Sequence, residues 1–125
     1  MKEDENALNA LTEKIIGCAF TVSNVLGAGF LEKVYENALA HELRKARVNA
    51  VQQKDIEVKY DGIVVGQYCA DLLVDSAVIV ELKALKAFDE VHYAQCLNYL
   101  RATGMKICLL LNFGTPRLQI KRFIV

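Results

Sequence analysis

Hydrophobic residues recur along the chain with two different periods, and each period predicts one kind of element. Steps of three and four over 7–26, 31–46 and 90–103 predict amphipathic helices. Strict alternation, or short runs of Val, Ile and Leu, predicts β-strands in the remaining segments. The predicted order is therefore α-α-β-β-β-α-β-β, with strands over 51–60, 63–74, 78–83, 106–112 and 118–124.

Residues that favour turns separate these segments. Gly27 and Gly104 follow the first and third helical patterns, where a left-handed cap ends a helix, and Asp89 is suited to cap the start of the third. Asp61-Gly62 predicts a two-residue hairpin turn between the first two strands. Gly27-Ala-Gly29 is interpreted as a tight connection between helices, because it lacks the Gly-Lys-Ser/Thr ending of a phosphate-binding loop.

A few charged residues interrupt the most hydrophobic stretch, from Tyr68 to Leu85, and three of them lie within its predicted strands. Asp71 lies in the second predicted strand, and Glu81 and Lys83 lie in the third. Strands this apolar are usually covered on both faces, where an unpaired charge costs several kcal/mol. A sheet needed only for stability would place Val or Thr there, so these three residues form a candidate site.

The turn between these two strands decides whether the three side chains meet. Glu81 and Lys83 are two residues apart and share one face of a regular strand. A two-residue turn at Asp75-Ser76 would place Asp71 on the opposite face. A three-residue loop over 75–77, or a bulge, puts Asp71 opposite Glu81 instead. We predict the odd loop or the bulge.

The residue types fit a divalent cation site. Mg²⁺ binds hard oxygen ligands, usually one or two carboxylates together with waters and substrate phosphate. Asp71 and Glu81 supply the carboxylates, and the backbone carbonyl of Leu82 is a further oxygen beside them. Lys83 would reach the same space, where an ammonium orients or helps deprotonate an attacking water, or stabilises phosphoryl charge. The alternative, equally compatible with the spacing, is a buried ion pair of Lys83 with Asp71 or Glu81.

Two helices carry polar residues at the edge of their hydrophobic stripes. In the second helix, Glu32 and Glu36 lie one turn apart on this edge, where a glutamate is often simply amphipathic. In the third helix, His92, Gln95 and Tyr99 form a polar line at steps of three and four. Each set has a catalytic interpretation and a plainer one as an ordinary helix face.

Composition narrows the class of protein. A chain of 125 residues is expected to form one domain over 1–125, and a hydrophobic content of 54% excludes disorder. Its 15 basic and 15 acidic residues balance, which argues against non-specific coating of nucleic acid but not against phosphate binding through a metal. The apolar runs are too short to span a membrane, and the N-terminus shows no secretory signal. Four isolated cysteines fit free thiols in a reducing cytoplasm.

Taken together, these motifs resemble the signature of a known nuclease superfamily. Asp71, a nine-residue gap and Glu81-Leu-Lys83 resemble the motif of the PD-(D/E)XK nucleases. Gly29-Phe-Leu-Glu32-Lys-Val-Tyr35 resembles the pattern that names the GxxExxY family, a small bacterial and archaeal group placed in that superfamily. The resemblance runs from about residue 7 to residue 125, as expected of a complete member. Ala70 replaces the proline of the superfamily's name, at a position known to vary.

The resemblance implies an α/β (α+β) fold, with an αβββαβ restriction-endonuclease-like core and a mixed central sheet flanked by helices. The first helix and the last strand would be additions to this core. Gln95-Cys-Leu-Asn-Tyr99 resembles the Gln-x-x-x-Tyr motif of the exonuclease branch, where the pair supports the active-site edge and the substrate. The active-site set that the resemblance implies is Asp71 and Glu81 as metal ligands, Lys83 as the catalytic lysine, and either Glu32 or Glu36.

Three functions compete on these observations. The first is a Mg²⁺- or Mn²⁺-dependent nuclease that hydrolyses phosphodiester bonds, with DNA as the expected partner. The second is a non-catalytic nucleic-acid or protein-binding module on the same scaffold, and the third is a structural or oligomer-forming domain whose polar trio is an ion pair. The intact trio favours the nuclease. A homodimer would place two shallow basic rims along one duplex, and this would compensate for the lack of net positive charge in a single chain.

Overall fold

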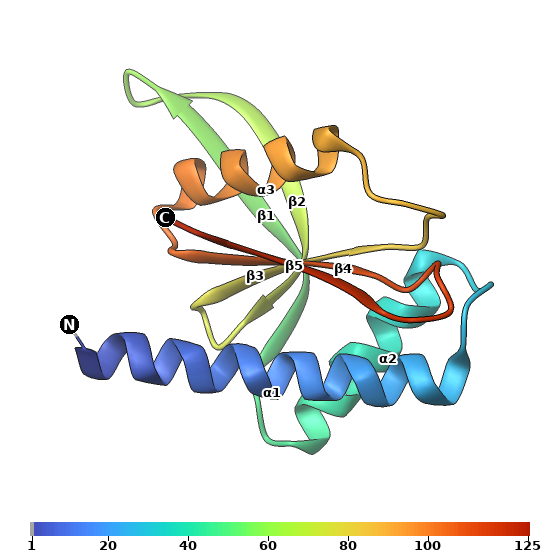
Figure 1. Ribbon diagram of the computed structural model, residues 1–125. Coiled ribbons are helices and arrows are strands. Elements are labelled where there is room, and N and C mark those ends of the chain that lie inside the picture. Colours follow the sequence, from blue (N-terminus) through green and yellow to red (C-terminus); the bar gives the residue numbers. More distant parts are fainter. Residues whose placement is uncertain (1) are drawn as a thin grey trace.

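The computed structural model describes residues 2–125. Its elements follow the predicted order, and the largest difference in bounds is the earlier start of the first helix (Figure 1). The helices are α1 (Lys2–Leu26), α2 (Glu32–Lys45) and α3 (Glu90–Thr103). The strands are β1 (Ala50–Tyr60), β2 (Ile63–Val74), β3 (Val78–Lys83), β4 (Ile107–Asn112) and β5 (Gln119–Ile124).

The strands form one mixed sheet in the order β1-β2-β3-β4-β5. Neighbouring strands are antiparallel except β3 and β4, which are parallel and joined by a crossover through α3. α1 and α2 cover one face of the sheet and α3 covers the other (Figure 1). This arrangement confirms the expected mixed central sheet flanked by helices.

β3 and β4 lie inside the sheet and are buried on both faces, as their continuous hydrophobic runs predict. In β3, Val80 and Leu82 pack toward α1 and α2, whereas Ile79 packs toward α3. Full burial of side chains such as Leu82 and Ile79 contributes roughly 1.5–3 kcal/mol each. Because successive side chains alternate, Glu81 and Lys83 lie on the Ile79 face. The charged residues of β3 are therefore held on the α3 side of a rigid hydrophobic strand.

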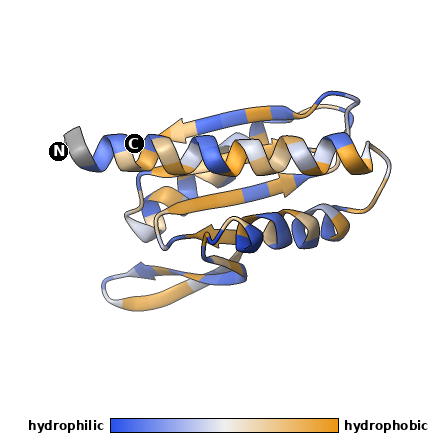
Figure 2. Cartoon of the chain, turned by 90° about the horizontal axis from the view of Figure 1, so that it is seen from below, coloured by the Kyte–Doolittle hydropathy of each residue, from blue (hydrophilic) through white to orange (hydrophobic). Residues whose placement is uncertain are grey.

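α1 packs on the sheet through the predicted stripe, with one exception. Ile15, Ala19 and Val22 are buried, and Figure 2, with α1 in front, shows hydrophobic and hydrophilic residues alternating along this helix. The pattern places Thr12 off the stripe, but Thr12 is fully buried. Its hydroxyl donates to the backbone oxygen of Asn9 at 2.9 Å, and this hydrogen bond allows a polar side chain in the core.

Two predicted turns are present as expected. Tyr60 pairs with Ile63 across Asp61-Gly62, whose φ angles of 53° and 77° match a type I′ hairpin turn. Asp89 accepts a hydrogen bond from a backbone nitrogen in the first turn of α3, and Gly104 ends that helix with a left-handed φ of 72°. These turns fix where the long β1–β2 hairpin and α3 begin and end.

Two expectations from composition can be compared with the structure. Cys18, Cys69, Cys96 and Cys108 are all free thiols, and the last two are buried. None of the helices in residues 2–125 has both the length and the apolar composition that a bilayer crossing requires.

Candidate active site

The loop between β2 and β3 has the odd length that the candidate site requires. Val74 pairs with Val78, so the loop holds three residues, 75–77. The backbone nitrogen of Ala77, the last residue of this loop, donates to the Val74 oxygen at 3.0 Å. This hydrogen bond closes a tight turn over Asp75 and Ser76, and Ala77 is the extra residue before β3. In this register Asp71 and Glu81 fall on the same face of the sheet, as predicted.

β2 and β3 separate where the acidic residues lie. Their backbone pairing reaches Leu72 and Val80. Asp71 is the residue of β2 just before Leu72, and its Oδ2 atom accepts a hydrogen bond from the backbone nitrogen of Leu82 at 2.8 Å. The carboxylate thus takes the place of a backbone acceptor at the point where the two strands diverge. This contact holds Asp71 beside Glu81.

Glu81 is buried without a full set of hydrogen bonds. It is 3% exposed, and its Oε1 atom has no hydrogen-bond partner in the described part of the chain. Burial, and after it the neighbouring Asp71 carboxyl, raise the pKa of Glu81 to about 10. An unsatisfied buried oxygen costs roughly 1–3 kcal/mol. The fold therefore bears a cost at this atom that a bound cation would remove.

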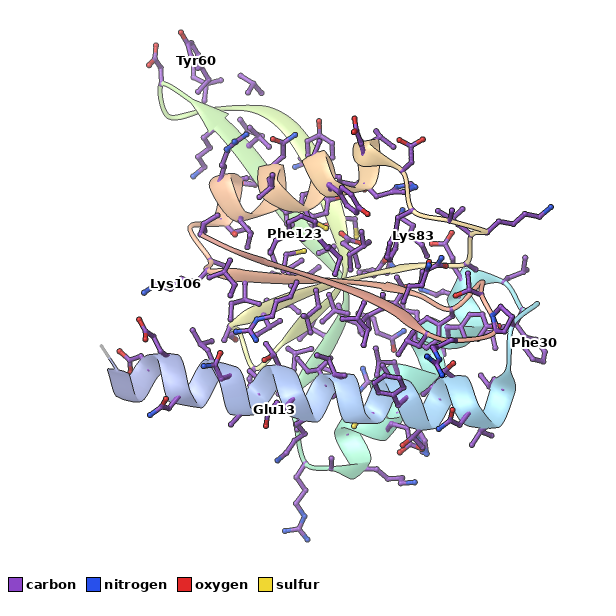
Figure 3. The ribbon with its side chains drawn as sticks, in the orientation of Figure 1. Glu13, Phe30, Tyr60, Lys83, Lys106 and Phe123 are labelled. Carbon is purple, nitrogen blue, oxygen red and sulfur yellow. The ribbon has the colours of Figure 1, made fainter. Side chains whose placement is uncertain are left out.

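Lys83, labelled in Figure 3, ends β3 and lines a cavity instead of pairing with a carboxylate of the described residues. Its backbone oxygen accepts a hydrogen bond from the Phe113 nitrogen at 2.8 Å, which holds the end of β3 against the chain that follows β4. Its side chain lines a cavity of about 430 Å³ together with Gln95 and Tyr99 of α3. The ion pairs formed by residues 4–125 do not include Lys83, so the buried ion pair that the spacing also allowed is not formed.

Gln95 and Tyr99 tie α3 to the same part of the sheet. Gln95 Nε2 donates to the Tyr99 hydroxyl at 2.8 Å, and that hydroxyl donates to the backbone oxygen of Cys69 at 3.4 Å. Tyr99 is 4% exposed, and burial raises its pKa above the usual range, so it keeps its proton for this hydrogen bond. Tyr99 is therefore part of the core and not of an ordinary polar helix face, whereas Gln95 is partly exposed.

The two candidate glutamates of α2 lie in different surroundings. Glu32 is exposed, in a first helical turn on which little packs, and this corrects the expectation that it borders the buried stripe. Glu36, one turn further, is 4% exposed. Its carboxylate accepts hydrogen bonds from Lys33 Nζ at 2.8 Å, Gln52 Nε2 at 2.7 Å and Gln53 Nε2 at 2.6 Å. Glu36 is thus a buried and well-satisfied carboxylate.

Gln53 is a residue that the sequence pattern does not single out. Its backbone φ of 54° is left-handed, which a residue other than glycine rarely adopts. Its side chain bridges two elements, because Nε2 donates to Glu36 and Oε1 accepts a hydrogen bond from the Cys69 thiol at 3.3 Å. Burial, and then the carboxylates around it, raise the pKa of that thiol. Since Cys69 is two residues from Asp71, Gln53 connects the α2 carboxylate to the acidic strand.

Asn112 is a second residue missed at the level of sequence. It ends β4, is fully buried, and accepts hydrogen bonds through Oδ1 from the backbone nitrogens of Leu85 at 2.9 Å and Gly114 at 3.0 Å. Its Nδ2 donates to the Leu85 oxygen at 3.0 Å and to the Gln119 side chain at 2.9 Å. This clamp fixes the segment that follows Lys83. A lone amide closing a run of hydrophobic residues is the signal that would have found it.

The Gly-x-x-Glu-x-x-Tyr pattern shapes the entrance to α2 through two of its three residues. Gly29 has a φ of 114°, which glycine reaches without strain. Tyr35 is fully buried, donates its hydroxyl proton to the Gly27 oxygen at 2.6 Å, and stacks on Phe113 with ring centroids 4.8 Å apart. The glycine and the tyrosine therefore have structural positions, and Glu32 is the exposed member of the pattern.

The site residues fit a divalent cation as a two-carboxylate site. Among the residues that the structure describes, no three His, Cys, Asp or Glu side chains lie close enough together to hold one ion. Asp71 and Glu81 are adjacent, however, and Glu81 Oε1 lacks a partner within the same part of the chain. Mg²⁺ typically takes only one or two carboxylates from the protein and completes its shell with water and phosphate. The donor set is therefore adequate for this class of ion.

The fold and the site define a class of protein, and comparison with known proteins agrees with it. A mixed five-stranded sheet with helices on both faces, carrying two carboxylates and a lysine where two central strands separate, is a restriction-endonuclease-like architecture. The family model of the PD-(D/E)XK nuclease superfamily matches residues 9–123, and the chain belongs to this superfamily. Membership suggests a metal-dependent nuclease and a nucleic-acid substrate.

One solved structure supports the fold independently. A crystal structure of SSO0001 matches with a TM-score of 0.58 and 17% sequence identity, over 74% of this chain and 50% of that one. The chain thus spans half the length of that protein, and at this identity the likeness shows the fold alone. No curated protein matches the sequence significantly.

Proposed function

We propose that the protein is a divalent-metal-dependent nuclease of the GxxExxY branch that hydrolyses phosphodiester bonds in DNA. The observation that carries the proposal is the buried Glu81 Oε1 atom, which has no partner among the described residues and lies beside Asp71. Lys83, on the same face of β3, is likewise outside any ion pair formed by the described residues. In a purely structural ion pair, the Lys83 ammonium would contact one of the two carboxylates. The order and spacing of Gly29, Glu32 and Tyr35 support the branch.

Asp71 and Glu81 would hold the cation, and the Leu82 carbonyl is the further oxygen that we assign to it. Mg²⁺ or Mn²⁺ suits this set, because both are hard ions that prefer carboxylate and carbonyl oxygens. When bound, the ion supplies Lewis-acid polarisation of a phosphoryl oxygen and a more acidic water. Glu81 must give up its proton to act as a ligand, so affinity for the ion is expected to rise with pH.

Lys83 would act on the substrate from the side of the cavity. Its ammonium can donate to a phosphoryl oxygen as negative charge grows there, or hold a proton exchanged with the attacking water at Nζ. Gln95 lines the same cavity and is the partly exposed member of its pair. We therefore assign substrate contact to Gln95, and to Tyr99 the role of holding Gln95 in position.

Glu36 is the helix glutamate that we assign to the site. It is buried and linked through Gln53 to the strand that carries Asp71, whereas Glu32 is exposed. The same contacts favour a second candidate function. A Glu36 carboxylate saturated by three donors suits a purely structural role, as in a non-catalytic nucleic-acid-binding module built on the same scaffold.

Cleavage assays on matched variants test the proposal. Purified protein with Mn²⁺ or Mg²⁺ should cleave DNA, and Asp71→Asn, which keeps an oxygen for the Leu82 nitrogen, should lower the rate roughly 100-fold or more. Lys83→Ala should do the same. The exposed residues Asp55 and Lys86 provide the controls Asp55→Asn and Lys86→Ala, which should retain activity.

Two outcomes would count against this assignment. Cleavage that survives both Asp71→Asn and Lys83→Ala would come from another site or another protein. If no DNA or RNA is cut, calorimetric binding of Mn²⁺ that is lost in Asp71→Asn would leave a metal site without the enzyme, and the binding module would replace the nuclease.

A further inference from the structure

A groove runs between α3 and the long β1–β2 hairpin, and it leads to Lys83. It consists of two adjoining hollows of about 740 Å³ and about 430 Å³. Both are lined by Val58 and Tyr68 of the hairpin and by Asn98 of α3, so they are parts of one groove. The larger hollow lies toward Arg101, and the smaller one ends at Lys83. Figure 1 shows the hairpin rising past α3 on this side of the sheet.

The shared part of the groove exposes an aromatic ring. Tyr68 is 54% exposed although it lines both hollows. Its ring centroid lies 5.9 Å from that of the buried Tyr99, with the planes inclined at 58°. Tyr99 therefore supports Tyr68 from the side of the core, and the rest of the ring faces the groove. An aromatic ring fixed in this way is suited to stack on a nucleobase.

The walls of the groove carry groups that suit a polynucleotide strand. Lys59 of the hairpin and Arg101 of α3 line the larger hollow from opposite sides, where cations can contact a phosphate backbone. Asn98 and Gln95 of α3 present amides, which can hydrogen-bond to base edges. Glu57 is the acidic member of the lining and limits the positive charge of the groove.

We propose that this groove binds an unpaired nucleic-acid strand, with one base stacked on Tyr68 and the backbone leading to Lys83. The inference rests on the proposed function in that it names the substrate class of the same site. A duplex hides the faces of its bases within the stack, so it offers nothing for Tyr68 to stack on. A balanced net charge also disfavours broad binding to a duplex, whereas a single strand in a groove needs only a few phosphate contacts.

Fluorescence anisotropy with the wild-type protein in EDTA tests the proposal without cleavage. A labelled single-stranded oligonucleotide should bind more tightly than the duplex of the same sequence. Tyr68→Ala should weaken single-strand binding roughly 5- to 150-fold, the effect of losing one base–aromatic stack. Tyr68→Phe should bind like the wild type, because it keeps the ring.

The matched control is Tyr60, which lies at the hairpin tip outside the groove and is 71% exposed (Figure 3). Tyr60→Ala should leave binding unchanged. Lys59→Ala and Arg101→Ala should each reduce the slope of log affinity against log salt by about 0.7, the value for one phosphate contact with a single strand.

Several results would overturn the inference. Equal or tighter binding to the duplex would do so, as would unchanged binding in a folded Tyr68→Ala protein. Competition by a free mononucleotide as effective as the strand would indicate a nucleotide pocket instead. Cleavage separates this inference from the proposed function. If a duplex is cut in a reaction that needs the metal and Asp71 but is unchanged in Tyr68→Ala, the proposed nuclease function stands and the proposed strand-binding groove is wrong. If single-strand binding depends on Tyr68 but no nucleic acid is cut, the groove stands and the nuclease function is wrong.

Discussion

Glu81 in β3 and Glu36 in α2 are buried to nearly the same degree, at 3% and 4% exposure, but their surroundings are opposite. Glu36 accepts hydrogen bonds from three side chains, two of them glutamines of the neighbouring strand. Glu81 has an oxygen without a partner among the described residues, and the carboxyl group of Asp71 lies beside it. Burial alone therefore does not identify a functional carboxylate. The missing donors around Glu81 support our assignment of this residue to the metal site, because an unsatisfied buried oxygen lowers stability unless a ligand contacts it.

The largest expected effect is on metal affinity, which should fall more in a Glu81 variant than in a Glu36 variant. Glu81→Gln should weaken Mn²⁺ binding by more than the roughly 10- to 100-fold that loss of a supporting hydrogen bond usually causes. The same variant should raise the thermal midpoint without added metal, because a neutral amide replaces a group that burial disfavours as an anion. Calorimetry and a melting curve on one preparation measure both effects.

The control for this prediction is Glu13→Gln, on the exposed side of α1 (Figure 3), and Glu36→Gln is the variant with which Glu81→Gln is compared. Glu13→Gln should change neither affinity nor stability. Equal losses of affinity in Glu81→Gln and Glu36→Gln would show that both carboxylates bind the ion, and the contrast between the two glutamates would be wrong.

The next largest effect concerns the stability that Glu36 provides. Glu36→Ala should lower the free energy of unfolding by roughly 1–3 kcal/mol, because the side-chain donors of β1 lose a buried acceptor. The matched control is Glu32→Ala, one turn earlier and exposed, which should stay within about 0.5 kcal/mol of the wild type. Urea denaturation measures both. A larger loss in Glu32→Ala than in Glu36→Ala would reverse our assignment of the two residues.

The contrast between the glutamates also marks how far sequence reasoning reaches. The hydrophobic periods predict every element in order, and the alternation of β3 places Glu81 and Lys83 on one face without any structure. The prediction of an odd loop or a bulge before β3 rests on the assumption that the three charged residues form one site, because a turn at Asp75-Ser76 is compatible with two registers. Glu32 and Glu36 could not be separated, since both lie at the edge of the same stripe and only the packing of the first turn distinguishes them.

Gln53 and Asn112 show what local patterns cannot contain. Gln53 looks like a surface residue in an alternating strand, and its role arises from a left-handed backbone and a partner 17 residues earlier in the chain. Asn112 closes a hydrophobic run, but two of its four side-chain hydrogen bonds join it to Leu85, which is 27 residues away. Long-range polar contacts of this kind depend on strand order and loop geometry, so they become visible only in the folded chain.

A smaller effect per unit of pH is expected from the titration of Glu81. The pKa of Glu81 rises from 4.5 to about 10 on folding, so the folded protein holds a proton that the unfolded chain releases. Its contribution to stability is fully present below pH 4.5 and is lost as the pH rises toward about 10, by at most about 1.4 kcal/mol per pH unit. Unfolding measured in EDTA between pH 5 and 9 should show this fall. The fall should be absent in Glu81→Gln, and a fall of equal slope in that variant would assign it to other groups.

The smallest effect is expected from Lys33, the cation that pairs with Glu36 at 2.8 Å. The Lys33 side chain is 57% exposed, so solvent screens the pair, and Lys33→Ala should cost only about 0.2–1 kcal/mol. Added salt should shrink this difference, because it screens an exposed charge more than a buried one. A loss as large as that of Glu36→Ala would mean that Lys33, and not the glutamines of β1, holds the carboxylate in place. The two glutamates would then differ chiefly in ion pairing, because Lys33 pairs with Glu36, whereas Lys83, on the same face as Glu81, forms no ion pair among the described residues.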